Sequence, residues 1–370
     1  MKPQLLAIAI SMLTVACSQQ VSNEKTTEQL ALRKYIPEPI LIGAAANQWQ
    51  VAGTCDKVES EVLANNFNCI TPENCMKSEV IVPEKDKYDF SLADEFVNYG
   101  VQHNMVIIGH ALIWHSQLAP WFCYDEAGNL VSADTLKQRM RNHIFTVMNR
   151  YKGKIHGYDV VNEAIEDDGS YRQSPFYNIL GEEFIDYAFQ CAQEADPNAE
   201  LYYNDYSMNK AGKRNTVCEL VKRLKSKGIR IDAVGLQSHM GLDFPNFEEL
   251  ETSVAAFINA GTRVQFTEVD MSVLPNPYNL EGAAVESDFE YSLDKDPYRE
   301  AVPDSVKAQW NERMAQFFGI VNKYAEHVNR VTFWGVTDEK SWKNDWPIRG
   351  RKDYALPFAR DGKLKLNRGI

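Results

Sequence analysis

Short apolar runs alternate with longer amphipathic stretches along most of the chain, from about residue 35 onward. Each run is short, rich in aliphatic side chains and bounded by polar residues, which is the pattern of a buried β-strand. The eight runs lie at 40–46, 67–71, 105–109, 157–161, 201–204, 233–237, 264–267 and 331–336.

The stretches between the runs have the length and charge pattern of surface helices. A helix is expected to open at Ser91, where residues 91–94 resemble a capping box. The other expected helices lie at 135–151, 182–194, 214–227, 247–260 and 306–327. Because strands alternate with helices, the sheet should be parallel. Eight such units predict a closed (β/α)8 TIM barrel. An open doubly wound sheet is the alternative, but no glycine-rich phosphate motif follows the first run.

Every apolar run finishes in polar or aromatic side chains. One such ending is ordinary turn chemistry, but eight in register are hard to explain that way. In a parallel barrel, chemistry sits at the C-terminal ends of the strands. The residues at these ends include Asn47, Glu73, Asn74, His110, Asn162, Glu163, Asn204, Asp205, Gln237, His239, Glu268, Asp270 and Trp334.

Two of these strand ends deliver a glutamate, Glu163 after the run at 157–161 and Glu268 after the run at 264–267. A carboxylate there is costly unless something uses or pairs it. Two carboxylates facing one site can serve as general acid and nucleophile at an acetal carbon. The alternative is that each glutamate sits in water at its strand end.

The composition narrows the class of partner. The 370 residues carry a formal net charge of -12, which disfavours nucleic acid and other acidic polymers. A neutral polymer or a small molecule fits better. The length allows one large domain or two ordinary ones.

The first residues predict an export signal. Lys2 precedes a mostly apolar run at 5–15 that is too short for a membrane-spanning helix. Residues 13–17 resemble a bacterial lipobox ending at Cys17, although Thr14 stands where leucine is usual. An ordinary signal peptide with a chance cysteine is the alternative. We therefore expect a lipoprotein signal at 1–17, a polar tether at 18–34 and one catalytic domain at 35–370. No other membrane attachment is expected.

Six further cysteines allow two interpretations. An exported chain can oxidise them, and buried free thiols are the alternative. Their spacing contains no CxxC pair that would indicate zinc. They are Cys55, Cys69, Cys75, Cys123, Cys191 and Cys218.

Several motifs in the right order make the chain resemble the glycoside hydrolase family 10 xylanases, from about residue 40 to the C-terminus. The motifs are FNCITPENCMK at 67–77, GHALIWHSQ at 109–117, DVVNEA at 159–164, GLQSH at 235–239, TEVD at 267–270, WGVTD at 334–338, SW at 341–342 and WPIRGR at 346–351.

The resemblance implies a role for each catalytic position. Glu163 matches the general acid/base, whose pKa should be raised, and Glu268 matches the nucleophile, which must stay ionised. Such a pair implies a retaining double displacement with carboxyls roughly 5–5.5 Å apart. His239 and Asp270 are placed to orient Glu268, and Asn162 matches a contact to the sugar 2-hydroxyl.

The resemblance also implies a set of substrate-binding residues. Polar groups would grip the sugar two places from the cut, and tryptophan faces would pack on pyranose rings. The set comprises Glu73, Asn74, Lys77, His110, Trp114, Gln117, Asn162, Gln237, His239, Trp334 and Trp342. Asn204 and Tyr206 match positions at the rim. The segment 274–303 is expected to overhang the cleft, as a polymer contact or as a surface loop.

We therefore expect an endo-1,4-beta-xylanase that acts on xylan or xylo-oligosaccharides as a monomer, with no cofactor and no metal. It should be exported, as an outer-membrane or cell-surface lipoprotein, or otherwise periplasmic or secreted. A relative that cuts cellulose or mixed-linkage glucan, and a catalytically silent glycan-binding barrel, are the alternatives.

Overall fold

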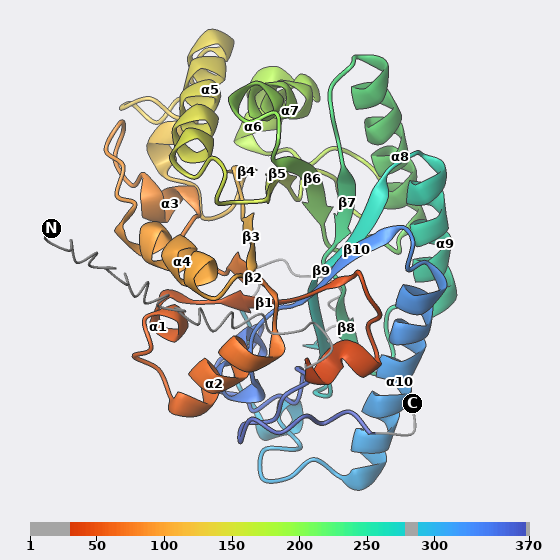
Figure 1. Ribbon diagram of the computed structural model, residues 1–370. Helices are drawn as coiled ribbons and strands as arrows, with labels where there is room; N and C mark the ends of the chain where they lie inside the picture. Colours follow the sequence, from red (N-terminus) through yellow and green to blue (C-terminus); the bar gives the residue numbers. More distant parts are fainter. Residues whose placement is uncertain (1–29, 278–287, 368–370) are drawn as a thin grey trace, which may run out of the picture.

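The computed structural model describes residues 30–277 and 288–367 and forms a closed barrel of parallel strands (Figure 1). The barrel order is β10-β1-β2-β3-β5-β6-β7-β9, and β9 pairs with β10 to close it. The predicted (β/α)8 barrel is confirmed. Its strands are β1 (Leu41–Ala46), β2 (Cys69–Pro72), β3 (Val106–Gly109), β5 (Gly157–Asn162), β6 (Glu200–Asp205), β7 (Ala233–Leu236), β9 (Arg263–Ser272) and β10 (Val328–Phe333).

Helices surround the strands as an outer layer (Figure 1). Six of them match predicted helices within a few residues: α4 (Ser91–Gln102), α5 (Ala133–Arg150), α7 (Glu183–Ala195), α8 (Ala211–Ser226), α9 (Phe247–Asn259) and α10 (Asp304–Lys323). Four were not predicted: α1 (Gln48–Val51), α2 (Lys57–Asn66), α3 (Ser78–Ile81) and α6 (Pro175–Leu180). Most of these four have only one or two turns, which is too little chain to show a helical period.

At the end of the barrel that carries the polar residues, the sheet extends farther than predicted. Two short strands, β4 (Ile113–Trp114) and β8 (His239–Gly241), pair with β5 and β9 beyond the barrel proper. Because β8 continues the ladder, β9 runs on to Ser272. Glu268 therefore lies within a strand, whereas Glu163 directly follows one.

The predicted capping box at Ser91 is wrong. The N-cap of α4 is Phe90, whose side chain makes no capping bond. The backbone N–H of Ser91 instead donates to Oδ1 of Asp89, at 2.9 Å. Ser91 thus lies inside the first turn, and an aspartate two residues earlier satisfies one free N–H group of the helix end.

Polar and apolar side chains together fill the barrel interior below the strand ends. Arg330 is fully buried there, and its Nη2 donates to Oε1 of Gln265 at 2.6 Å. A small cluster of Cys69, Ile108, Tyr202 and Ala233 packs beside it. Side chains therefore fill the barrel interior, and a site on this barrel is expected at the C-terminal ends of the strands.

The packed domain begins before the predicted boundary at residue 35. Leu30 and Leu32 are buried, and Tyr35 stacks on Phe318 with ring centroids 5.5 Å apart. The predicted tether at 18–34 therefore extends too far. The predicted signal and Cys17 lie outside the described residues. Within the ranges described, no helix has the length and apolarity needed to cross a bilayer.

The described residues include six cysteines and both ends of the segment 274–303. All six cysteines of the described chain are free. Residues 278–287 lie outside the described ranges, and the rest of the segment packs on residues 347–352. Phe289 N–H donates to the carbonyl of Pro347 at 3.0 Å, and Arg299 Nη1 donates to the carbonyl of Gly350 at 2.9 Å.

Candidate active site

Glu163 is a buried carboxyl at the C-terminal end of β5. Its backbone has a positive φ of 57°, and only 5% of the residue is exposed. The indole Nε1 of Trp114 donates to its Oε2, and Nε2 of Gln237 donates to its Oε1, both at 2.8 Å. Trp114 belongs to β4, which pairs with β5, and Gln237 directly follows β7, so two different strands fix the carboxyl.

The surroundings of Glu163 favour its protonated form. Burial, followed by the negative charge of Asp205 and then that of Glu268, raises the pKa of Glu163 to about 7. The hydrogen bonds from Gln237 and Trp114 oppose this effect. A carboxyl with this pKa is still mostly protonated at mildly acidic pH and about half protonated near neutral pH, so it can act as an acid.

Glu268 is buried within β9 and is held ionised. Nδ2 of Asn204 donates to its Oε1 at 2.8 Å, and Nε2 of His239 lies 3.2 Å from its Oε2. Burial alone would raise the pKa of Glu268. The hydrogen bond from His239, the charges of His110 and His239 and the bond from Asn204 outweigh burial, and hold the pKa below its usual value.

His239 links Glu268 to a second buried carboxylate. Its Nδ1 lies 2.9 Å from Oδ2 of Asp270, which also accepts the indole N–H of Trp342 at 2.7 Å. Burial would lower the pKa of His239, but the charge and hydrogen bond of Asp270, with the contact to Glu268, raise it. A protonated imidazole between two carboxylates stabilises both charges.

Three amide side chains connect the two glutamates. Gln237 Nε2 lies within hydrogen-bond distance of both Glu163 and Oδ1 of Asn162, at 2.8 and 3.4 Å. Asn204 Nδ2 donates to Asn162 Oδ1 at 2.9 Å and to Glu268. A continuous buried path of neutral amides thus runs from one carboxyl to the other.

A group of polar side chains lies beyond the ends of β1, β2 and β4. Lys77 Nζ donates to Asn74 Oδ1 at 2.9 Å and to Gln117 Oε1 at 2.5 Å. Oε2 of Glu73 accepts from Nδ2 of Asn47 at 2.6 Å. Burial raises the pKa of Glu73, and the charge of Lys77 opposes this. This set presents carboxylate, amide and ammonium groups side by side.

Aromatic rings stand around the buried polar groups. Lys77 Nζ lies 4.9 Å from the centroid of the Trp114 ring. His110 packs edge-on to Trp334, with centroids 5.3 Å apart, and its Nδ1 lies 2.9 Å from Oδ2 of Asp159. Trp342 stacks on Trp346 at 4.6 Å and tilts against His239 at 4.9 Å. Each of the three predicted tryptophans therefore contacts another residue of the site.

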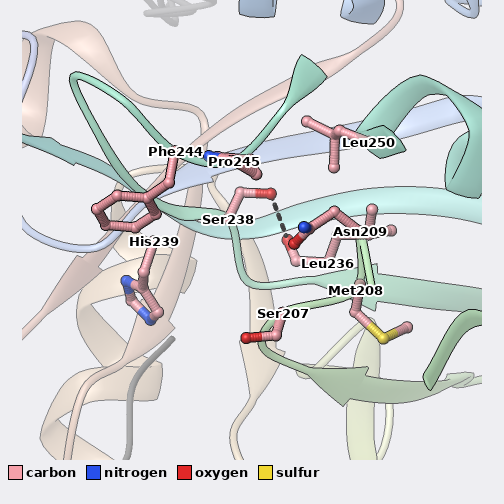
Figure 2. A pocket seen from close by; sticks show the side chains of 9 residues that line it. All are labelled: Ser207, Met208, Asn209, Leu236, Ser238, His239, Phe244, Pro245 and Leu250. Atoms are coloured by element: carbon pink, nitrogen blue, oxygen red, sulfur yellow. Dashed lines mark hydrogen bonds between the residues drawn. The ribbon is translucent and has the colours of Figure 1, made fainter. Parts of the chain in front are cut away.

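A small pocket adjoins His239 between the ends of β6 and β7 (Figure 2). Its free volume is about 20 Å³, which is room for one water-sized group. Ser207 and Ser238 line it, both with positive φ, and the Ser238 hydroxyl donates to the carbonyl of Leu236 at 3.2 Å. The pocket is too small for a sugar ring.

The structure brings every predicted site residue in the described ranges to one end of the barrel. Sequence reasoning missed partners that hold these residues. Asn47 bonds Glu73, and Asp159 bonds His110. Asn204, expected only at the rim, contacts Glu268 directly. Asn47 and Asn204 were counted among the polar strand ends, but the sequence did not indicate that they contact Glu73 and Glu268. Asp159 lies inside β5 and carries no such signal.

The described residues contain no group of three or more histidine, cysteine, aspartate or glutamate side chains arranged to hold a metal ion. Two carboxyls of the site, those of Glu163 and Glu268, can carry acid and nucleophile chemistry. The pKa of Glu163 is raised to about 7 and the pKa of Glu268 lies below its usual value, and both residues stand at the C-terminal end of the barrel. This arrangement can donate a proton to a leaving group and attack a carbon beside it.

Comparisons with known proteins agree on one family. The sequence profile described as Glycosyl hydrolase family 10 matches residues 31–367. "Endo-1,4-beta-xylanase A" of Xylanibacter ruminicola is 47% identical over 345 residues, which are 93% of this chain and 92% of that protein.

Two solved structures show the same similarity in three dimensions. A "novel GH10 endoxylanase retrieved from sugarcane soil metagenome" superposes with a TM-score of 0.85 and 40% identity, over 90% of this chain and 96% of that one. A mutant structure in complex with xylotriose superposes with a TM-score of 0.79 and 30% identity, over 90% and 95% of the two chains.

Proposed function

The chain belongs to glycosyl hydrolase family 10 and is a retaining endo-1,4-beta-xylanase; on this premise we propose that Glu163 is its acid/base and Glu268 its nucleophile. One observation carries the assignment. Two buried carboxyls of one site have pKa values displaced in opposite directions, to about 7 for Glu163 and below the usual value for Glu268. Environments that separate two carboxyls in this way distinguish an acid from a nucleophile.

In the first step, a carboxylate oxygen of Glu268 attacks the anomeric carbon of the xylose at the cleavage point. Glu163 transfers its proton to the glycosidic oxygen, so the leaving chain departs as a neutral alcohol. The electrons of the broken bond stay on that oxygen. The xylose is then bound to Glu268 through a covalent ester.

In the second step, Glu163 has lost its proton and acts as a base. It takes a proton from a water molecule, whose oxygen attacks the anomeric carbon and displaces Glu268. Two inversions return the β configuration. A retaining pair of this kind is expected to have carboxyls about 5–5.5 Å apart.

We propose that the network behind Glu268 keeps the nucleophile ionised. A charged His239 donates to Glu268 from one nitrogen and to Asp270 from the other. Asn204 supplies a further donor to Glu268. These donors support a carboxylate more than a carboxylic acid, so the pKa stays low despite full burial.

We propose that the remaining polar residues bind the sugars. Asn162 would bond the 2-hydroxyl of the xylose being cleaved, since it lies between the two glutamates. The group of Glu73, Asn74, Lys77 and Gln117 would hold the hydroxyls of a xylose farther along the chain. Trp114, Trp334 and Trp342 would pack on pyranose faces, with His110, Gln237 and His239 contacting the sugar at the cut.

A product profile tests the function. We expect reducing ends to appear on linear β-1,4-xylan, with oligosaccharides of mixed length at early times, and little release from cellulose or mixed-linkage glucan. Early release of one short product would contradict an endo habit. Binding of xylan without any release of reducing ends would indicate the silent glycan-binding alternative.

The rate should depend on pH through the two glutamates. Because Glu163 must be protonated in the free enzyme, kcat/KM is expected to fall as pH rises through about 7. The acid limb follows Glu268, whose pKa lies below its usual value, so activity should persist to low pH. Measure kcat/KM for an aryl β-xylobioside across pH, and repeat it with Glu163→Gln, which should lose the basic limb. A rate that rises through neutral pH would argue against Glu163 as the acid.

Trp342 is expected to contribute to the preference for xylose over glucose. A side chain that fills the space of the glucose hydroxymethyl group rejects it sterically. Trp342→Ala should narrow the ratio of kcat/KM for aryl β-xylobioside over aryl β-cellobioside by about ten-fold, since one such contact discriminates by roughly 1–3 kcal/mol.

The hydrogen bond from Trp342 to Asp270 supplies the control for this measurement. Loss of this hydrogen bond should disturb the hydrogen bonds around His239 and lower kcat/KM for both substrates. Asp270→Asn should therefore lower both rates and leave their ratio unchanged. If Trp342→Ala behaves in the same way, the indole supports Asp270 and does not select the sugar.

We propose that the chain is exported and anchored by a lipid on Cys17, as an outer-membrane or cell-surface lipoprotein. The support is the apolar run before Cys17 and the polar stretch after it. Firm attachment needs more than one acyl chain. Cys17→Ser should release the enzyme from the membrane fraction with its xylanase activity intact, and unchanged membrane association would refute the anchor.

We also propose that the protein is a monomer, since one chain supplies the whole site. Light scattering measures the mass of the particle in solution and so tests this.

A further inference from the structure

The backbone of Glu163 adopts a left-handed conformation, with φ of 57°. Residues with a β-carbon rarely adopt this region, and it persists only where the surrounding structure holds it. The conformation turns the chain sharply at the end of β5. It therefore decides where the carboxyl of Glu163 lies.

Strand β6 holds this turn beyond the end of the regular ladder. The last paired residues are Asn162 and Asn204, and the N–H of Glu163 donates to the carbonyl of Asn204 at 2.9 Å. After that, two side chains of β6 accept the next N–H groups. Ala164 N–H donates to Oη of Tyr203 at 3.1 Å, and Ile165 N–H lies 3.4 Å from Oδ2 of Asp205.

The two side chains are fixed to each other and to α8. The hydroxyl of Tyr203 donates to Oδ2 of Asp205 at 2.6 Å. Nζ of Lys213 donates to Oδ1 of Asp205 at 2.9 Å and to the carbonyl of Tyr206 at 3.0 Å. Tyr203, Asp205 and Lys213 are all fully buried. Water therefore cannot easily replace any of these bonds.

The carbonyl of the peptide group between Glu163 and Ala164 is also held. Nε of Arg172 donates to the carbonyl of Glu163 at 2.9 Å, and its Nη2 donates to Oη of Tyr206 at 2.5 Å. The peptide group after Glu163 is thus held at both its carbonyl and its N–H by side chains that do not themselves reach the nucleophile, and the peptide group before Glu163 is held by the backbone carbonyl of Asn204.

We propose that Tyr203 and Asp205 are positioning residues for the acid/base: they hold the left-handed turn at Glu163 and so aim its carboxyl at the glycosidic oxygen. The inference rests on the proposed role of Glu163. Proton transfer needs a donor within hydrogen-bond reach of the leaving oxygen. A turn that relaxes toward ordinary φ would swing the carboxyl away, while Glu268 on β9 would stay in place.

The variant Tyr203→Phe tests this, because it removes one hydroxyl and keeps the ring. The readout is kcat/KM, which reports the step that forms the covalent intermediate, on two aryl β-xylobiosides. Phenol is a poor leaving group that needs the proton, and 2,4-dinitrophenol is a good one that does not. For the phenyl substrate we expect a loss of about ten- to hundred-fold, the scale of an ångström-level misplacement. The dinitrophenyl substrate should stay close to wild type.

Tyr202→Phe is the matched control. Tyr202 precedes Tyr203 on β6, is also buried, and its hydroxyl donates to Oε2 of Glu200 at 2.8 Å. Loss of this hydroxyl disturbs the same strand without touching the turn. The ratio of the two substrates should therefore stay at its wild-type value in this variant.

The outcomes separate the inference from the proposed function. An equal loss on both substrates, or no loss on either, would overturn the positioning role. If Tyr203→Phe does not fold, as judged by its thermal unfolding, Asp205→Asn replaces it with the same criteria. Because loss of the Asp205 charge also lowers the pKa of Glu163, kcat/KM of this variant is taken at a pH below its own basic limb. If Glu163→Ala itself shows no dependence on the leaving group, the acid/base assignment fails, and the positioning role fails with it.

Discussion

Glu268→Ala is expected to reduce xylan hydrolysis by at least about 10⁴-fold, because no other group can form the covalent intermediate. The structure places the carboxylate on β9 with two donors aimed at it, from His239 and Asn204. Without the carboxylate, both donors face an empty space at the anomeric carbon. The measurement is kcat on xylan, together with xylotriose affinity by calorimetry, which should show that the variant still binds the sugar.

Added azide supplies the control for this variant. A small anion can enter the space left by the side chain and attack the anomeric carbon from the same side. With an activated aryl β-xylobioside, Glu268→Ala should therefore form an α-configured azide, because only one inversion takes place. A β-configured product would place the nucleophile elsewhere.

Glu163→Ala is expected to lose about 10²–10⁴-fold on xylan, the usual range for general acid–base catalysis. The loss in kcat/KM should be far smaller with 2,4-dinitrophenyl β-xylobioside, whose leaving group departs without a proton. The covalent intermediate then forms normally and accumulates, because no base activates water. Pre-steady-state release of dinitrophenolate should show this as a burst.

Azide should rescue the second step of this variant with the opposite stereochemistry. It attacks the covalent intermediate from the face where water normally enters, so the product should be the β-configured azide. An α-configured product from Glu163→Ala would mean that the two assignments are reversed. The two variants thus check each other by product configuration, independently of their rates.

The barrel could be predicted from the sequence because its strands are short aliphatic runs, and because helices separate them at regular spacing. The site could be predicted because a parallel barrel brings every strand end to one edge. Glu163 and Glu268 are separated by 105 positions in the sequence, and the alternation of strands and helices alone indicates that both reach that edge.

Other features left no signal in the sequence. Glutamate has no preference for left-handed backbone, so the turn at Glu163 follows from its hydrogen bonds to β6, which appear only in the folded chain. The strand β8 has only three residues, too few for a pattern of its own, and it forms because β9 is available beside it. At Ser91 the capping pattern was present, but Asp89 competes for the same N–H group.

The amide side chains between the two glutamates affect how protons can move within the site. A chain of hydrogen bonds leads from Glu163 to Glu268 through the side chains of Gln237, Asn162 and Asn204, in that order. Unlike imidazole, carboxyl or water, a carboxamide does not readily gain or lose a proton near neutral pH. The path therefore fixes the two glutamates relative to each other but does not conduct protons between them. The acid therefore does not pass its proton to the nucleophile along this path, and the opposite displacements of the two pKa values keep the proton on Glu163.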